Sequence, residues 1–169
     1  GSSRRAGGVD RDAAVTTNAP AEAAPVTVER IALVGNPNTG KTTAFNRLCG
    51  IRSHTANMPG STVEARHGRC TVGGRTIEVI DLPGIYGLNL DRPESSVSRK
   101  YLAGELDPEH RPHAALVVMD ATNLQRNLVL ASQALQQGLP AVVALNMMDL
   151  VRKSGGSIGV EELERRLGC

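Results

Sequence analysis

A glycine-rich segment that ends in lysine and threonine carries the clearest chemical signal in the sequence. It fits the pattern G-x-x-x-x-G-K followed by Ser or Thr, which is typical of loops that bind phosphate. Such a loop points several backbone N–H groups at one anion, and a helix beginning at Lys41 would direct its positive end there. We expect Lys41 to contact the β- and γ-phosphates and Thr42 to ligate Mg²⁺. A glycine-rich turn before an ordinary helix is the alternative. The predicted phosphate-binding residues are Gly35, Asn36, Pro37, Asn38, Thr39, Gly40, Lys41, Thr42 and Thr43.

A second segment, Asp81-Leu-Pro-Gly84, follows a predicted strand. A carboxylate at that position can hold Mg²⁺ through water, and Gly84 can offer its N–H to a γ-phosphate when the loop closes. Taken alone, the segment could be a simple turn. The phosphate-binding loop in the same chain favours the functional interpretation.

A third segment, Asn146-Met147-Met-Asp149, also follows a predicted buried strand. An aspartate there can accept hydrogen bonds from the N1–H and 2-amino groups of guanine, which adenine lacks. Asn146 can bind the base edge and brace the phosphate-binding loop. As the third element in this order, the segment indicates guanine rather than adenine as the base.

The segment between Gly50 and Glu64 has no apolar periodicity and is interpreted as a mobile loop. Thr62 is the candidate whose hydroxyl and N–H meet Mg²⁺ and the γ-phosphate only in the triphosphate state. Thr55 and Ser61 are the competing candidates. A loop that orders on GTP and relaxes on hydrolysis is a known kind of switch.

Short apolar runs alternate with helical patterns along the rest of the chain. This alternation predicts an α/β fold in which helices cover both faces of a mostly parallel sheet. Five strands are predicted, at 31–34, 69–72, 76–80, 114–119 and 141–145. Helices are predicted at 41–49, 124–137 and 160–167, with residues 94–100 on the outer face of a further helix. Asp120 and Asn123 are expected to cap the helix that begins at Leu124.

Length and composition exclude several classes of protein. The 169 residues fit one domain, and 40% hydrophobic with 21% charged residues fit a globular chain. An aromatic content of 2% and a net charge of +2 argue against a nucleic-acid partner. No apolar run approaches the roughly 18 residues that span a bilayer, so we expect the chain as given to be soluble. Residues 1–27 are expected to form a disordered tail, and residues 28–169 the domain.

The cysteines and histidines show no metal-ligand spacing. Cys49 and Cys70 are expected to pack in the core. The histidines are expected to be solvated loop residues, and iron ligation is the alternative for them. They are His54, His67, His110 and His113.

Together these segments resemble the cytoplasmic G domain of ferrous iron transport protein B (FeoB), a P-loop NTPase fold. The resemblance runs from about residue 31 to the end of the chain. It rests on the segments Gly35-Asn-Pro-Asn-Thr-Gly-Lys-Thr-Thr43, Asn57-Met-Pro-Gly-Ser-Thr-Val-Glu64 and Asp81-Leu-Pro-Gly-Ile-Tyr-Gly-Leu88, with Val118-Met-Asp-Ala-Thr-Asn-Leu-Gln-Arg-Asn127 and Ala144-Leu-Asn-Met-Met-Asp149 in support.

The resemblance implies a GTPase attached to an iron(II) transporter, at the cytoplasmic face of the bacterial inner membrane. GTP or GDP, Mg²⁺ and K⁺ are the implied ligands. Asn38 corresponds to an asparagine that helps hold K⁺, with backbone carbonyls near Ala56–Asn57. The resemblance implies slow turnover, because Ile85 stands where many GTPases carry a glutamine that positions water. The residues implied to act in hydrolysis are Lys41, Thr62, Gly84 and Asn38.

The resemblance also implies that a last guanine-contacting loop, a strand and a helix follow Cys169. We therefore expect the G domain to be incomplete at its C-terminus, with an open sheet edge that invites homo-oligomers. The transmembrane portion of the transporter is the implied partner. A nucleotide-sensing module with little turnover is the alternative function, and a GTPase of ribosome assembly is disfavoured. A role for Arg126 as a stabilising arginine acting in trans is also disfavoured.

Overall fold

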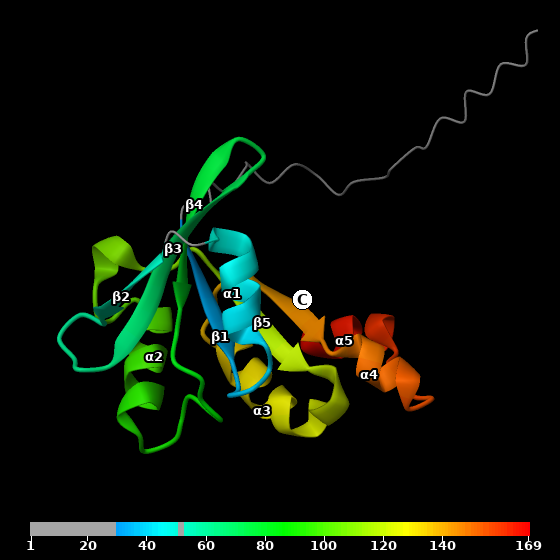
Figure 1. Ribbon diagram of the computed structural model, residues 1–169. Helices are drawn as coiled ribbons and strands as arrows, with labels where there is room; N and C mark the ends of the chain where they lie inside the picture. Colours follow the sequence, from blue (N-terminus) through cyan, green and yellow to red (C-terminus); the bar gives the residue numbers. More distant parts are fainter. Residues whose placement is uncertain (1–29, 51–52) are drawn as a thin grey trace, which may run out of the picture.

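Six strands form one sheet in the computed structural model, which describes residues 30–50 and 53–169 (Figure 1). Their order across the sheet is β2-β3-β4-β1-β5-β6. The β4–β1, β1–β5 and β5–β6 pairings are parallel, whereas the β2–β3 and β3–β4 pairings are antiparallel. The predicted α/β fold with a mostly parallel sheet is confirmed. The strands are β1 (Arg30–Gly35), β2 (Ser53–Asn57), β3 (Glu64–Val72), β4 (Arg75–Asp81), β5 (Ala114–Asp120) and β6 (Ala141–Asn146).

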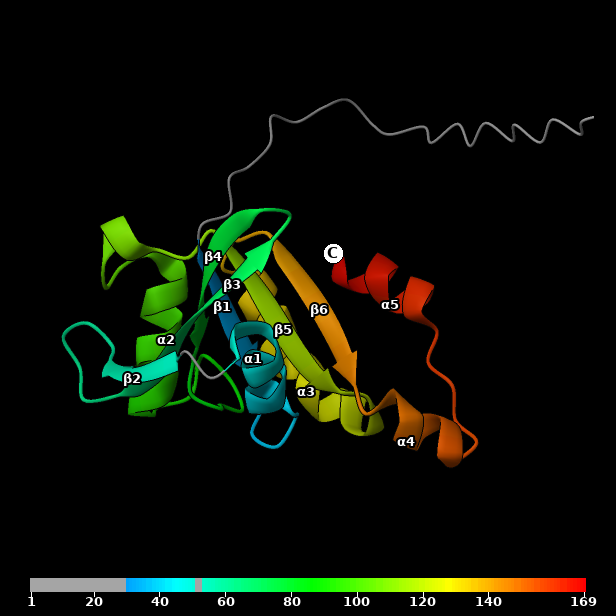
Figure 2. The same cartoon turned by 45° about the horizontal axis from the view of Figure 1, so that its top comes forward.

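Helices cover both faces of this sheet, as the sequence predicts. Figure 2 shows α1 on one face and both α2 and α3 on the other. Among the described residues, no helix has the length and apolar character needed to cross a membrane. The helices are α1 (Lys41–Cys49), α2 (Pro93–Ala103), α3 (Leu124–Leu135), α4 (Met148–Lys153) and α5 (Val160–Leu167), with single 3-10 turns at Pro108–His110 and Ala121–Asn123.

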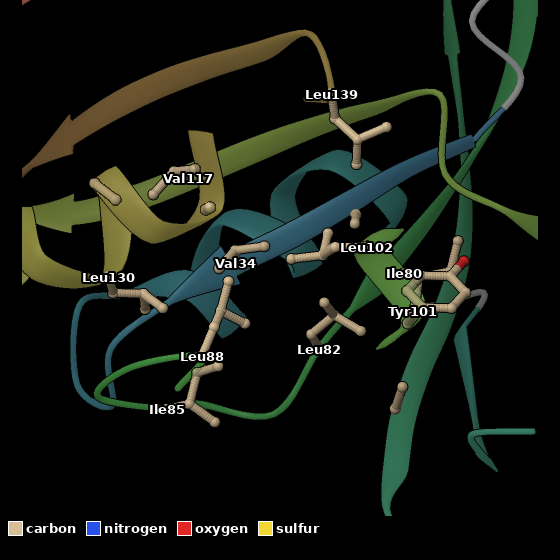
Figure 3. Packing of buried hydrophobic residues seen from close by; sticks show 14 of the residues in the cluster. Val34, Ile80, Leu82, Ile85, Leu88, Tyr101, Leu102, Val117, Leu130 and Leu139 are labelled. Carbon is tan, nitrogen blue, oxygen red and sulfur yellow. The ribbon is translucent and has the colours of Figure 1, made fainter. Parts of the chain in front are cut away.

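Two apolar clusters hold the helices to the sheet. The smaller one joins α1 to the sheet and is made of Leu33, Phe45, Cys49, Val79 and Val118. The larger one lies under α2 and α3. Figure 3 shows part of it, with the buried side chains of Ile85 and Leu88 below β1 and Val34. The segment that follows Asp81 is therefore tied to the core.

The region between Gly50 and Glu64 differs from its prediction as a mobile loop. Residues Ser53–Asn57 form β2, which pairs antiparallel with β3, so the sheet has six strands and not five. Strand β3 also begins at Glu64, well before the predicted residue 69. The apolar pattern could not reveal β2, because backbone pairing to β3 and not burial of alternate side chains defines it. The predicted tail at 1–27 lies outside the described residues.

The parallel strands bring the three chemically marked segments to one edge of the sheet. Leu33 pairs with Asp81, Gly35 with Val118, and Asp120 with Asn146, so β1, β4, β5 and β6 end close together. In open α/β sheets, ligands bind outside the carboxyl ends of the strands. The topology therefore indicates where a site would lie.

Candidate functional site

The glycine-rich loop between β1 and α1 surrounds a cavity of about 400 Å³. The cavity lies at the carboxyl end of β1 and the N-terminus of α1. Such a helix N-terminus favours anions, since its first N–H groups lack partners within the helix. The lining residues are Asn36, Pro37, Asn38, Gly40, Lys41, Thr42, Thr43 and Gly84. Seven of the nine predicted loop residues thus share one cavity with Gly84.

Backbone strain is concentrated in the same region. Among the described residues, Asn38 (φ 65°) and Met147 (φ 62°) are the two non-glycine residues with positive φ. One lies in the glycine-rich loop and the other in the segment Asn146–Asp149. Non-glycine residues pay of order 1–3 kcal/mol for such conformations, which cluster at binding sites.

Lys41 is buried and points back toward the end of β4. Its Nζ atom forms an ion pair with the carboxylate of Asp81 and also donates to the carbonyl of Leu82. The two charged side chains are 8% and 4% exposed. The predicted phosphate-binding lysine and the predicted Mg²⁺-binding carboxylate therefore neutralise each other in a water-poor setting.

Asn146 braces the glycine-rich loop, as the sequence predicts. Its Nδ2 donates to the Thr39 carbonyl at 2.8 Å, and Thr39 Oγ1 donates to the Asn36 carbonyl at 2.9 Å. Gly40 is needed where these segments meet, because a Cβ at this residue would lie 2.2 Å from Asn146 Nδ2. Asp149 leaves its carboxylate 69% exposed, 4.0 Å from Lys153. Asp149 is thus open to a base beside a fixed loop.

Gly84 packs directly against the glycine-rich loop. A Cβ at Gly84 would lie 3.2 Å from Pro37 Cα, so a side chain here would push the two segments apart. The next residue, Ile85, donates its N–H to the Gly35 carbonyl at 3.3 Å and is 4% exposed. Ile85 is therefore a core residue, and its side chain offers no hydrogen-bonding group to a water molecule.

The predicted switch residues do not share this cavity. Thr62 and Ser61 line a separate cavity with Asn57 and Pro93, and Thr55 pairs with Arg66 in the β2–β3 ladder. Figures 1 and 2 both place the β2–β3 turn at the outer side of the sheet, away from the connection between β1 and α1. A role for Thr62 or the Ala56–Asn57 carbonyls at the phosphates needs a movement of this hairpin.

The expectation that the histidines lie in loops is wrong for His54 and His67. They face each other across β2 and β3, with ring centroids 5.4 Å apart. Burial lowers the pKa of His67, and nearby Glu78 opposes this only in part. Within residues 30–50 and 53–169, no cluster of three or more His, Cys, Asp or Glu side chains could hold a metal ion.

The cysteines Cys49 and Cys70 lie in or against the smaller apolar cluster, as predicted, and burial raises the pKa of each thiol.

The predicted caps of α3 are only partly right. Asp120 accepts a hydrogen bond from Thr122 N–H at 2.8 Å in the preceding 3-10 turn, whereas Asn123 makes no side-chain cap bond. Asn127 orders this connection instead, through the Asp120 N–H and the Asn123 carbonyl.

Two residues of α3 contact the segment after Gly84, and no pattern in the sequence marks these contacts. Gln133 Oε1 accepts a hydrogen bond from the Leu88 N–H at 2.7 Å. The Arg126 guanidinium lies over the Tyr86 ring, 4.2 Å from its centroid. No spacing signal links residues about 40 positions apart, so only the fold could reveal these pairs.

Comparison with known proteins identifies the family. A family model described as ferrous iron transport protein B matches residues 29–169. The chain is 46% identical over 141 residues to the Fe(2+) transport protein A/Fe(2+) transporter FeoB fusion protein of Porphyromonas gingivalis, covering 83% of this chain and 16% of that protein. It is 40% identical over 144 residues to the Fe(2+) transporter FeoB of Escherichia coli K12, covering 82% of this chain and 18% of that one. The chain therefore spans less than a fifth of these curated relatives.

Solved structures agree with this match. The G domain of the T. maritima FeoB iron transporter is 34% identical with a TM-score of 0.72, and the match covers 83% of this chain and 82% of that one. A mutant NFeoB of S. thermophilus bound to GDP is 42% identical with a TM-score of 0.74, covering 83% and 53%. The chain belongs to the ferrous iron transport protein B family, and its described fold is that family's N-terminal G domain.

Proposed function

We propose that this chain binds guanine nucleotides with Mg²⁺ and hydrolyses GTP to GDP and phosphate. The observation that carries the proposal is the meeting of Lys41, Gly84 and Asn146 around one glycine-rich loop, from three segments far apart in the chain. The GDP complex of a relative 42% identical to this chain supports the choice of nucleotide.

Each segment has a separate task in this proposal. Lys41 and the loop N–H groups bind the phosphates, and the Gly84 N–H contacts the γ-phosphate. The hydroxyl of Thr42 and the carboxylate of Asp81 are hard oxygen donors that suit Mg²⁺. That ion would supply charge neutralisation at the phosphates. Asp149 recognises guanine, because its exposed carboxylate can accept from two donors on the base edge.

Potassium dependence is the finer part of the proposal. Asn38 lines the cavity between the glycine-rich loop and Gly84, here called the phosphate cavity, and offers an amide oxygen, which suits a monovalent cation. The Ala56–Asn57 segment pairs with β3 and would have to leave that pairing to contribute carbonyls. We propose that this rearrangement accompanies GTP binding and carries Thr62 toward the γ-phosphate.

A nucleotide-sensing module with little turnover is the second candidate. Buried Ile85 favours it, because the residue after Gly84 cannot orient an attacking water. Phosphate release from GTP with Mg²⁺, compared in KCl and NaCl, separates the two. The enzyme is supported if phosphate release is faster in KCl than in NaCl, and if Asn38→Ala loses this difference but still binds GDP. Equal release in both salts contradicts the potassium site, and binding without release supports the sensing module.

We further propose that the domain couples its nucleotide state to iron(II) uptake by a transmembrane portion, at the cytoplasmic face of the membrane. The family match supports this role. In a full-length transporter that carries this domain, Lys41→Ala is expected to abolish nucleotide binding and lower iron(II) uptake. Unchanged uptake with binding abolished would contradict the coupling.

A further inference from the structure

We propose that α3 clamps the segment Ile85–Leu88 and thereby holds Gly84 at the phosphate cavity, with Gln133 and Arg126 as positioning residues. This inference rests on the proposed binding of guanine nucleotides. It assigns α3 a part in distinguishing GTP from GDP.

The clamp has two contacts on one side of α3. Gln133 Oε1 accepts from the Leu88 backbone N–H at 2.7 Å, and the Arg126 guanidinium covers the Tyr86 ring at 4.2 Å. Residues 126 and 133 are seven positions apart, which places them two turns apart on the same helix face. Each contact thus holds a different point of the segment.

The segment is also anchored from beneath. Leu88 is 1% exposed and, with Ile85, belongs to the larger apolar cluster, where Leu130 of α3 also lies (Figure 3). Leu130 sits between the two clamp residues along the helix. The backbone of Ile85 is tied to the Gly35 carbonyl. Gly84 therefore stands between a fixed glycine-rich loop and a segment that α3 restrains.

This restraint has a consequence that depends on the nucleotide. Gly84 lines the phosphate cavity and packs against Pro37, so its backbone is held at the cavity before a γ-phosphate arrives. A preordered donor spares GTP the cost of ordering the segment. GDP has no γ-phosphate and does not use this donor. Loosening the clamp should therefore weaken binding of the triphosphate and leave GDP binding unchanged.

The test compares dissociation constants for GDP and a non-hydrolysable GTP analogue. In Gln133→Met the Leu88 N–H loses its acceptor, and we expect analogue binding to weaken roughly tenfold. Gln133→Glu keeps an acceptor oxygen and should restore most of it. GDP binding should stay within about twofold in both variants. Gln136→Met, at an exposed glutamine of the next turn, is the matched control and should bind both nucleotides as the unmodified chain does.

Arg126→Leu gives an independent test, because Arg126 is exposed and its replacement leaves the core intact. We expect analogue binding to weaken about two- to fivefold through loss of the contact with Tyr86. This variant keeps the proposal testable if Gln133→Met does not fold in a thermal melt.

Three results would overturn the clamp: equal weakening for both nucleotides, no weakening in Gln133→Met and Arg126→Leu, or no recovery in Gln133→Glu. Failure of the unmodified chain to bind either nucleotide would instead overturn the proposed function.

Discussion

Lys41 and Asp81 form a buried ion pair between the glycine-rich loop and the end of β4. The two residues are also the proposed ligands of phosphate and of Mg²⁺. Binding of a nucleotide therefore requires Lys41 to exchange one anion for another. This exchange makes Asp81 a competitor of the phosphates when Mg²⁺ is missing.

The first prediction concerns this competition. Asp81→Asn should raise GDP affinity in Mg²⁺-free buffer about tenfold, because it removes a negative charge beside the phosphates and releases Lys41. In Asp81→Asn, the increase in GDP affinity on adding Mg²⁺ should be smaller than in the unmodified chain. Titration of a fluorescent GDP with EDTA or Mg²⁺ measures both effects. Asp91→Asn, at an exposed aspartate, is the control, and weaker GDP binding in EDTA would contradict the competition.

The second prediction concerns Gly40. Gly40→Ala should destabilise the domain by about 2–5 kcal/mol and abolish nucleotide binding. The new Cβ would clash with Asn146, and alanine would also have to adopt an unfavourable left-handed backbone conformation. Gly60→Ala isolates the backbone cost, because Gly60 also has positive φ (67°) but has nothing within 4 Å of its Cβ. That variant should lose about 1–2 kcal/mol and keep binding. Urea unfolding and GDP titration measure the difference, and equal losses would refute the proposed brace.

The third prediction concerns the switch threonine. Thr62→Ala should weaken Mg²⁺-dependent binding of a GTP analogue about tenfold and spare GDP, because only the triphosphate state is proposed to recruit this hydroxyl. Thr55→Ala should bind both nucleotides as the unmodified chain does. Ser61→Ala removes bonds to the Met58 carbonyl and the Val63 N–H, so it should affect both nucleotides equally. A selective loss in Thr55→Ala would instead transfer the role to that residue.

The fourth prediction concerns pH. Burial lowers the pKa of His67 below its ordinary 6.5, so between the lowered value and 6.5 the folded chain binds fewer protons than the unfolded chain. His67 thus contributes stability that is present above pH 6.5 and is lost as pH falls to the lowered pKa.

Urea unfolding between pH 7.5 and 5 measures this loss, and His67→Gln should flatten the slope. The pKa of Glu78 is also lowered: burial would raise it, but Arg30 and His67 outweigh this. Its contribution has the same sign but falls away only below its ordinary 4.5, outside the measured range. An unchanged slope in His67→Gln would show that another group is responsible.

The sequence predicted most elements correctly wherever local signals were strong. Helix α1 begins and ends at the predicted residues, because Gly40 precedes it and Gly50 follows its last apolar residue. Helix α5 also has the predicted bounds, and within it Glu162 contacts both Arg165 and Arg166. The buried strands β1 and β5 were found from their continuous apolar runs. The same pattern was wrong about burial for β6, which lies at the edge of the sheet and leaves Val142 66% exposed.

The kind of site is a prediction from the sequence alone. The spacing of Gly35, Gly40 and Lys41, followed by Asp81 and Asn146 at strand ends, indicated one phosphate-binding loop with its accessory segments. Parallel pairing then brings those strand ends together, so their meeting was predictable.

The partners of these residues follow from tertiary packing and not from any pattern in the sequence. Lys41 holds Asp81, Gln133 holds Leu88, and Arg126 covers Tyr86, each across a separation that no local pattern encodes. The same holds for β2, whose side chains lack an apolar alternation and whose strand exists through hydrogen bonds to β3. Local propensity acts over a few residues, whereas these contacts depend on how the sheet and helices pack.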